Sequence, residues 1–209
     1  MLRPTPGPFK RTWDSKGIAD FELTERSGKT ISKKDLLGKP WIVSFIFTRC
    51  AGPCPKVSYE MYKLQEWLRA HQMDVQLVSI SVDPQTDTPE VLKKYAENFG
   101  ADSKRWWFLT GDRDKVYKLI NESFRQVVRE SQGAFRKPGF EVIHTTALLL
   151  VDEKGRVVEG YNGQYDKTIA DLHRRLRAWK KFGSFEVDHP ESAPTKPVPA
   201  KKPSSRKSL

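Results

Sequence analysis

Cysteine is scarce in this sequence, since the 209 residues include only Cys50 and Cys54. A framework of several disulfides is therefore excluded. Apolar runs are short, and none approaches the roughly 18 residues of a membrane-spanning helix. The N-terminal stretch MLRPTPGPFKR also lacks the apolar segment of a signal peptide. We therefore expect either a cytosolic protein or the soluble part of a longer precursor.

Acidic residues are outnumbered, because 37 Lys and Arg against 26 Asp and Glu give a net charge of +11. Such a balance is typical of proteins that bind nucleic acids, acidic partners or anionic membranes. Residues 190–209 hold five basic residues and one Glu, so this stretch alone carries +4. No concentrated basic face with interleaved aromatic residues is visible elsewhere. We therefore expect no nucleic-acid partner.

Apolar periodicity predicts alternating strands and helices. Residues 21–23 followed by 27–30 are expected to form a short strand, a turn and a second strand. Further strands are expected at 41–47, 75–82, 106–109, 145–151 and 156–161, and helices from about 55 and at 88–99, 111–124 and 166–182. Residues 126–142 are predicted to be irregular or a hairpin. This order predicts an α/β sandwich in which parallel strands come first and an antiparallel hairpin closes the sheet.

Composition divides the chain into three predicted parts. Residues 1–16 are rich in Pro and Gly and are expected to form an extended lead-in. Residues 17–185 are expected to form one folded domain. Residues 186–209 form a basic Pro/Lys/Ser tail that cannot bury a core, and we expect it to be disordered.

Both cysteines lie in TRCAGPCP, the predicted turn between a buried strand and a helix. A thiol at a helix N-terminus has a lowered pKa, because the helix dipole and unpaired N–H groups favour the thiolate. Arg49 is expected to add a nearby positive charge. The spacing allows a disulfide, a redox couple or two ligands of one metal ion. A purely structural pair remains an alternative, although a disulfide across so short a loop stabilises little.

A third ligand for a metal ion would have to come from elsewhere in the chain. Two thiolates do not complete a four-ligand zinc site, whereas soft Cu(I) accepts thiolate and imidazole ligands. His71 lies at a helix end, and His189 lies beside the tail. His173 lies among arginines on the last predicted helix, where we expect it to be exposed. His144 precedes a strand and follows a long irregular segment that could reach the cysteines. Its position fits a structural role equally well.

Four sequence blocks together resemble the Sco/SenC family of thioredoxin-like copper chaperones for cytochrome c oxidase assembly. The blocks are FIFTRCAGPCP, LVSISVDPQTDTPEVLKKYAENFG, WWFLTGD and HTTALLLVDEKGRVV. The resemblance covers about residues 21–181. It implies a thioredoxin-like, peroxiredoxin-related three-layer sandwich with a central mixed sheet. It also implies that Cys50, Cys54 and His144 hold a copper ion, Cu(I) or Cu(II).

The resemblance further implies delivery of copper to the binuclear copper centre of an oxidase subunit. The implied partners are that subunit or a copper donor protein. The resemblance also implies that the protein is a monomer and that it works outside the cytoplasm. The location would be the periplasm, with a membrane tether, or the mitochondrial intermembrane space. Membrane proximity would come from an anchor missing from this chain or from the basic tail. Ala51 and Ile143 depart from the family, in which Pro and Asp are frequent at these positions.

Three other functions fit parts of the pattern. A thiol-disulfide oxidoreductase needs Cys50 and Cys54 as its catalytic redox pair but not His144. A peroxidase of the peroxiredoxin type needs one activated cysteine with Thr and Arg partners, for which Thr48 and Arg49 are a poor fit. An interaction module would use the basic tail. We expect a metallochaperone in preference to a turnover enzyme.

Two aspartates follow the second predicted buried strand. Asp83 precedes Pro84 and is interpreted as restraining a turn, and Asp87 lies at the positive end of the next helix. The alternative is that both form a rim near the copper site that contacts partners.

Overall fold

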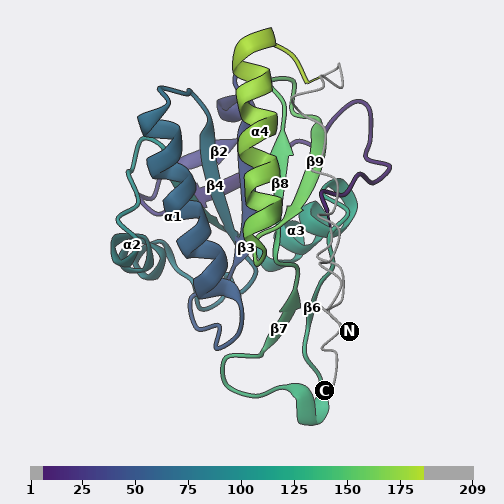
Figure 1. Ribbon diagram of the computed structural model, residues 1–209. Helices are drawn as coiled ribbons and strands as arrows, with labels where there is room; N and C mark the ends of the chain where they lie inside the picture. The colour runs from purple at the N-terminus through teal and green to yellow at the C-terminus, as the bar shows by residue number, and fades with distance from the viewer. Residues whose placement is uncertain (1–6, 186–209) are drawn as a thin grey trace, which may run out of the picture.

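The computed structural model describes residues 7–185 and is built around a seven-stranded mixed sheet in the order β2-β1-β5-β4-β3-β8-β9 (Figure 1). The three inner strands run parallel: β3 (Trp41–Ile46), β4 (Gln76–Ser81) and β5 (Trp106–Thr110). Antiparallel pairing adds the outer strands: β1 (Glu22–Glu25), β2 (Thr30–Ser32), β8 (Ala147–Val151) and β9 (Val157–Asn162). The predicted parallel core with a closing antiparallel hairpin is confirmed.

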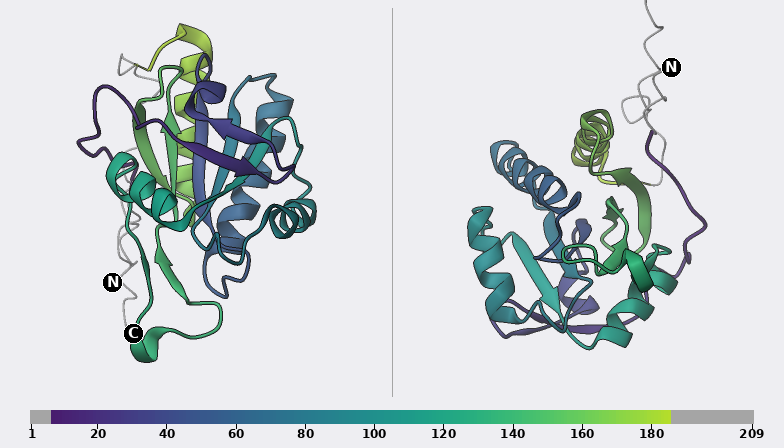
Figure 2. Two further views of the ribbon diagram at one scale, coloured as in Figure 1. Left: turned by 180° about the vertical axis from the view of Figure 1, so that it is seen from behind. Right: turned by 90° about the horizontal axis from the view of Figure 1, so that it is seen from below.

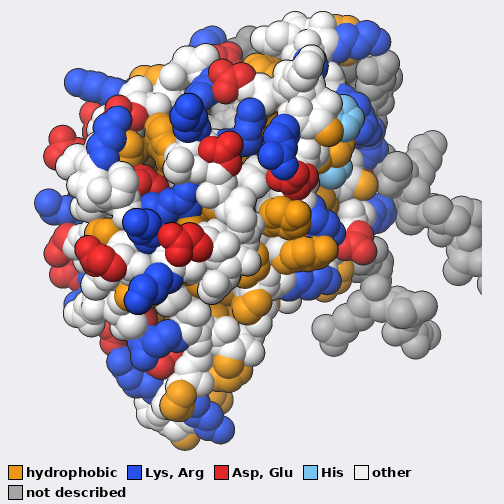
Figure 3. Space-filling model, turned by 90° about the vertical axis from the view of Figure 1, so that its left-hand side faces the viewer, with side chains coloured by type: hydrophobic (Ala, Val, Ile, Leu, Met, Phe, Trp, Pro, Cys, Tyr) orange, Lys and Arg blue, Asp and Glu red, His pale blue; other side chains and the backbone are white. Residues whose placement is uncertain are grey.

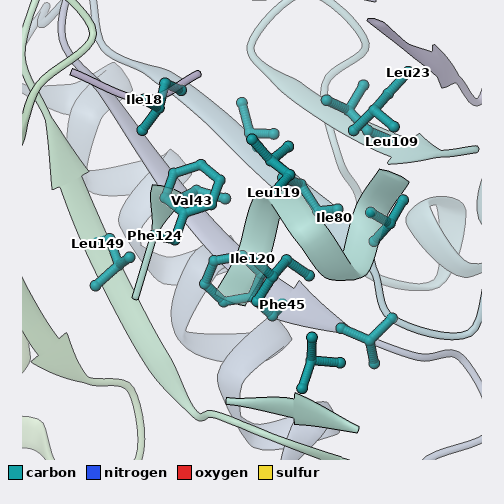
Figure 4. Close-up of a cluster of buried hydrophobic side chains, with 14 of the residues drawn as sticks. Ile18, Leu23, Val43, Phe45, Ile80, Leu109, Leu119, Ile120, Phe124 and Leu149 are labelled. Atoms are coloured by element: carbon teal, nitrogen blue, oxygen red, sulfur yellow. The ribbon is translucent and has the colours of Figure 1, made fainter. Parts of the chain in front are cut away.

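Helices cover both faces of this sheet, so the fold has three layers (Figures 1 and 2). One face packs against α1 (Cys54–Ala70), α2 (Pro89–Asn98) and α4 (Asp166–Phe182). The other packs against α3 (Arg113–Lys118) and the π-helical turn η2 (Leu119–Ser123), as the cluster in Figure 4 shows. Along β3, Ile42 and Val43 enter opposite clusters because successive strand side chains alternate. The predicted thioredoxin-like, three-layer class is confirmed.

The helix after the cysteines forms where the apolar stripe predicted it. The stripe is fully buried against the sheet and consists of Val57, Met61, Leu64 and Leu68. Pro55 lies in the first turn, where its missing N–H costs little. At the start of α2, the Thr88 side chain accepts a hydrogen bond from the N–H of Val91, which confirms its predicted capping role.

Residues 126–144 leave the main sheet. The short strands β6 (Val128–Glu130) and β7 (Val142–His144) pair antiparallel, with the 3-10 turn η3 (Gly133–Phe135) between them. In Figure 1 this hairpin extends below the body of the domain. The hairpin alternative predicted for 126–142 is therefore the correct one.

Two differences from the predicted elements have a visible structural cause. The helix predicted at 111–124 changes from α-helical to π-helical hydrogen bonding at Leu119. The strand predicted from residue 145 begins at Ala147, because the Thr145 hydroxyl accepts the Ala147 N–H at 3.1 Å and turns the chain between the two sheets.

Residues 7–18 contact β9 at one point and then the residue that follows η2. Phe9 and Gly160 exchange backbone hydrogen bonds of 2.8 Å, and the Phe9 ring occupies the space that a Cβ on Gly160 would need. The indole N–H of Trp13 donates to the carbonyl of Phe124. The tail predicted at 186–209 lies outside the described residues. Among the helices within 7–185, none combines the length and hydropathy needed to span a bilayer.

Candidate metal centre

The two cysteines lie where β3 ends and α1 begins, beyond the carboxyl end of a central parallel strand. This is the edge at which open α/β sheets commonly bind ligands. Cys54 is the first residue of α1 and is 1% exposed, whereas Cys50 is half-buried in the preceding loop. Both are free thiols. The geometry leaves Cys50 as the sulfur that another molecule reaches first.

His144 completes the group from the last position of β7. Its Nε2 atom lies 3.0 Å from the Sγ of Cys54, and the ligand atoms of Cys50, Cys54 and His144 all lie within 4.8 Å of one another. The Nδ1 atom lies 2.9 Å from the carbonyl oxygen of Thr145. Because a carbonyl only accepts, Nδ1 carries a proton, and the other ring nitrogen, Nε2, faces the thiols. The ring edge of Phe47 packs against the imidazole at 5.6 Å.

The two thiols titrate very differently. The pKa of Cys50 is lowered to about 4, mainly because the Cys54 thiol donates to its sulfur, with further help from His144 and from the backbone N–H groups of Cys54 and Gly52. The pKa of Cys54 is raised, because its proton is shared with the Cys50 thiolate and because it is buried. Cys50 is thus a thiolate at neutral pH, while Cys54 holds a proton.

Arg49 contacts neighbouring loops, and the prediction that it adds a positive charge near the thiols stays a prediction. Its guanidinium donates to a carboxylate oxygen of Asp83 at 2.8 Å and to the hydroxyl of Thr86 at 3.0 Å. It also lies 3.5 Å from a carboxylate oxygen of Glu141. The guanidinium therefore joins the cysteine loop to two neighbouring loops, and the pKa of Cys50 is lowered by local hydrogen bonds.

Asp87 supports the cysteine loop from beneath. Its carboxylate is fully buried and accepts hydrogen bonds from the hydroxyl of Thr48 at 2.6 Å, the N–H of Thr48 and the hydroxyl of Ser81. Burial raises the pKa of Asp87, and these hydrogen bonds limit the rise. A buried carboxylate cannot contact a partner, so the rim interpretation is wrong for Asp87. The sequence placed Asp87 only at the positive end of α2, whereas its carboxylate also holds the cysteine loop through Thr48.

The hairpin also touches the cysteine loop directly. The N–H of Ala51 donates to the carbonyl of Gly139 at 3.1 Å. Gly139 has a φ of +81°, and a Cβ on it would lie 2.5 Å from the Cβ of Ala51. Only glycine fits both conditions. Sequence reasoning missed this contact, although Pro138-Gly139 is a recognisable turn signal.

The remaining histidines do not join this group. His71 and His173 each stack on Trp67 with ring centroids 4.2 Å apart. His173 was expected to be exposed, but it is partly buried between α1 and α4, and burial lowers its pKa to about 4. His189 lies outside the described residues. The donor set is therefore two sulfurs and one imidazole nitrogen, which suits a soft ion such as Cu(I) and falls short of the four ligands of a structural zinc site.

Comparisons with known proteins identify a family. The sequence model of the family described as SCO1/SenC matches residues 10–180. The chain is similar to a "SCO1 protein homolog" of Bacillus subtilis (strain 168), with 35% identity over 160 residues, covering 74% of this chain and 80% of the relative.

Two solved structures share the fold. One is BsSco, described as a member of the Sco family of cytochrome c oxidase assembly proteins, with a TM-score of 0.69, 31% identity, and coverage of 79% of this chain and 94% of that one. The other is Bradyrhizobium japonicum ScoI with copper bound, with a TM-score of 0.63, 29% identity, and coverage of 76% and 98%.

Proposed function

The chain belongs to the SCO1/SenC family, and we propose that it is a copper metallochaperone that delivers copper to the binuclear copper centre of cytochrome c oxidase. The observation that carries the proposal is the convergence of Cys50, Cys54 and His144 within 4.8 Å. The copper-bound state of a similar structure and the oxidase-assembly description of another support it. We assign the activity to the folded domain predicted at 17–185.

Each ligand contributes differently to loading. Cys50 offers a thiolate without prior loss of a proton, because its pKa is about 4. Cys54 must give up its proton, so binding to the reduced protein should release about one proton per copper ion. The ring of His144 already presents its Nε2 atom to the thiols, because its Nδ1–H donates to the carbonyl of Thr145. Copper here is the cargo of the protein.

The burial of the two cysteines predicts the side from which an acceptor approaches the copper ion. Cys54 is 1% exposed, whereas Cys50 is half-buried. An acceptor thiolate can therefore approach copper from the Cys50 side and replace that ligand first. All three donor atoms come from one chain, which supports a monomer as the working form. We propose an extracytoplasmic location, where the oxidase centre would be assembled.

The alternative of a thiol-disulfide oxidoreductase is not favoured. It would use Cys50 and Cys54 but would give no role to the imidazole that lies 3.0 Å from Cys54. An experiment can distinguish the two functions, because Cys50 and Cys54 stay reduced after copper delivery but become oxidised when they reduce a disulfide.

The test is to mix the copper-loaded protein, without oxygen, with the copper-free soluble domain of the oxidase subunit. Copper is then measured in each protein after separation. We expect copper to move to the oxidase domain while both chaperone thiols stay reduced. Copper that remains on the chaperone, with disulfide exchange between the proteins, would support the oxidoreductase instead.

A further inference from the structure

Exposed apolar side chains are concentrated on the 126–144 hairpin. The described residues include eight large hydrophobic side chains that are exposed, and four of them lie on these 19 residues. The four are Val127, Phe135, Phe140 and Ile143, which are 57%, 81%, 50% and 41% exposed. Isolated exposed apolar residues need no explanation, but a cluster on one projecting element is typical of an interaction surface.

This cluster adjoins the metal ligands. The ring of Phe140 lies 3.6 Å from the position that a Cβ on Gly52 would take, and that same position is 3.6 Å from the Sγ of Cys50. Ile143 immediately precedes the ligand His144. A molecule that docks on the exposed faces of Phe140 and Ile143 would therefore meet the Cys50 side of the centre, the side on which copper is accessible.

The hairpin surface is also positively charged. Its two acidic residues both form ion pairs, which join Glu130 to Arg113 and Arg136, and Glu141 to Arg49. Arg129 and Lys137 are exposed, and within residues 7–185 no carboxylate forms an ion pair with either of them. Figure 3 shows orange and blue side chains together at the narrow lower end of the molecule. The complementary surface is apolar with acidic residues at its edge.

Backbone contacts hold the surface in one conformation. The hydroxyl of Ser131 donates to the carbonyl of Phe140 at 2.6 Å, and the N–H of Ser131 donates to the carbonyl of Glu141 at 2.8 Å. Gly139 is fixed to Ala51. A surface that is ordered before binding loses less conformational entropy on docking.

We propose that the 126–144 hairpin is the docking surface for the protein that exchanges copper with this chain. The partner presents an apolar contact to Phe140 and Ile143 and acidic residues to Arg129 and Lys137. The inference rests on the proposed function, because it presupposes a protein partner that exchanges copper. The surface assigned to that partner is distinct from the three copper ligands.

The test compares the double variant Phe140→Ser/Ile143→Ser with the control Leu37→Ser. Leu37 is 42% exposed, like Ile143, but precedes β3 and so lies at the opposite end of that strand from the cysteines. Copper stoichiometry is measured first, and then the rate of transfer to the copper-free soluble oxidase domain. We expect the double variant to bind one copper ion and to transfer it at least about tenfold more slowly, while the control matches the unmodified protein.

Charge is tested with Lys137→Glu. Transfer by the unmodified protein should slow as salt is raised, and the variant should be slower at low salt and less sensitive to salt. Unchanged rates in the double variant would overturn the docking surface. So would a loss of copper stoichiometry, since Phe140 would then shield the centre instead.

Two other outcomes distinguish a failure of the proposed function from a failure of the docking inference alone. If the unmodified protein binds copper but transfers none, the proposed function fails and the docking inference falls with it. If the double variant transfers copper normally but no longer floats with vesicles containing phosphatidylglycerol, the surface contacts membrane lipid and the docking inference is wrong.

Discussion

The Nε2 atom of His144 lies 3.0 Å from the Sγ of Cys54, although 90 positions of sequence separate the two residues. The contact joins the end of β7 to the start of α1. It depends on the hairpin that leaves the main sheet and returns beside the cysteine loop. The metal centre is therefore a product of the tertiary fold, with two ligands supplied locally and the third by a distant segment.

His144→Ala should weaken copper binding more than the about 10–100-fold that loss of a supporting contact costs, because it removes a ligand. Thiol-disulfide exchange should remain nearly unchanged, because both cysteines are retained. Competition with a copper chelator measures the first quantity, and reduction of a disulfide peptide measures the second. Unchanged copper retention would show that His144 is not a ligand.

Alkylation of the reduced protein should be nearly independent of pH from about pH 5 to 8. The pKa of Cys50 is lowered to about 4, so the thiolate persists at every pH above that value and is lost only as the pH falls through it. An ordinary thiol, with a pKa of about 8.5, loses reactivity about tenfold per pH unit. The same lowered pKa contributes stability above the unfolded-state value, which is lost as pH falls through about 4.

Iodoacetamide labelling followed by peptide mass spectrometry measures this profile and locates the label. Cys50 should carry it, and Cys54 should stay largely unmodified because it is buried and its pKa is raised. The urea-unfolded protein is the control, since both thiols should then follow the ordinary profile. A tenfold change per pH unit in the folded protein would refute the lowered pKa.

Gly139→Ala should destabilise the protein and reduce copper retention. Adopting a positive φ costs an alanine about 1–2 kcal/mol, and the new Cβ would also meet Ala51 at 2.5 Å. The matched control is Gly133→Ala, which has a φ of +55° in the same hairpin but nothing within 4 Å of its Cβ position.

Both variants share the backbone cost, so the difference between them reports the contact with Ala51. Urea unfolding and copper competition should both show a larger effect for Gly139→Ala. Equal effects would mean that the hairpin is not fixed by the cysteine loop.

Asp87→Asn should cost about 1–3 kcal/mol of unfolding free energy, because an amide group would leave the buried N–H or hydroxyl of Thr48, or the hydroxyl of Ser81, without an acceptor. Asp83→Asn is the comparison. It removes an ion pair with a half-exposed Arg49, an interaction worth about 0–1 kcal/mol. Urea denaturation measures the loss of unfolding free energy in both variants. A larger loss for Asp83→Asn than for Asp87→Asn would contradict this account of the loop.

Local patterns predicted much of the fold and two of the three ligands. The apolar stripe from Val57 to Leu68 specified α1, and the strand-turn-helix context placed Cys50 and Cys54 at a sheet edge. Position alone left His144 open between a ligand and a structural residue, and the family resemblance was needed to favour it. The π-helical turn after Lys118 has no periodic signature of its own, so its boundary was missed.

Long-range contacts explain the remaining differences. Arg49 was assigned to the thiolate because they are adjacent in sequence, whereas Asp83 and Glu141 become its neighbours only in the folded chain. Asp87 reaches Thr48 across 39 positions. Such partners are not encoded in a short window of residues.

Anaerobic copper titration of the reduced protein, in parallel with Cys50→Ser, Cys54→Ser and His144→Ala, tests the central claim most directly. The account predicts one tightly bound copper ion per chain, with retention lost or strongly reduced in all three variants. Tight binding that survives any one of these substitutions, or no tight binding by the unmodified protein, would contradict a copper centre formed by Cys50, Cys54 and His144.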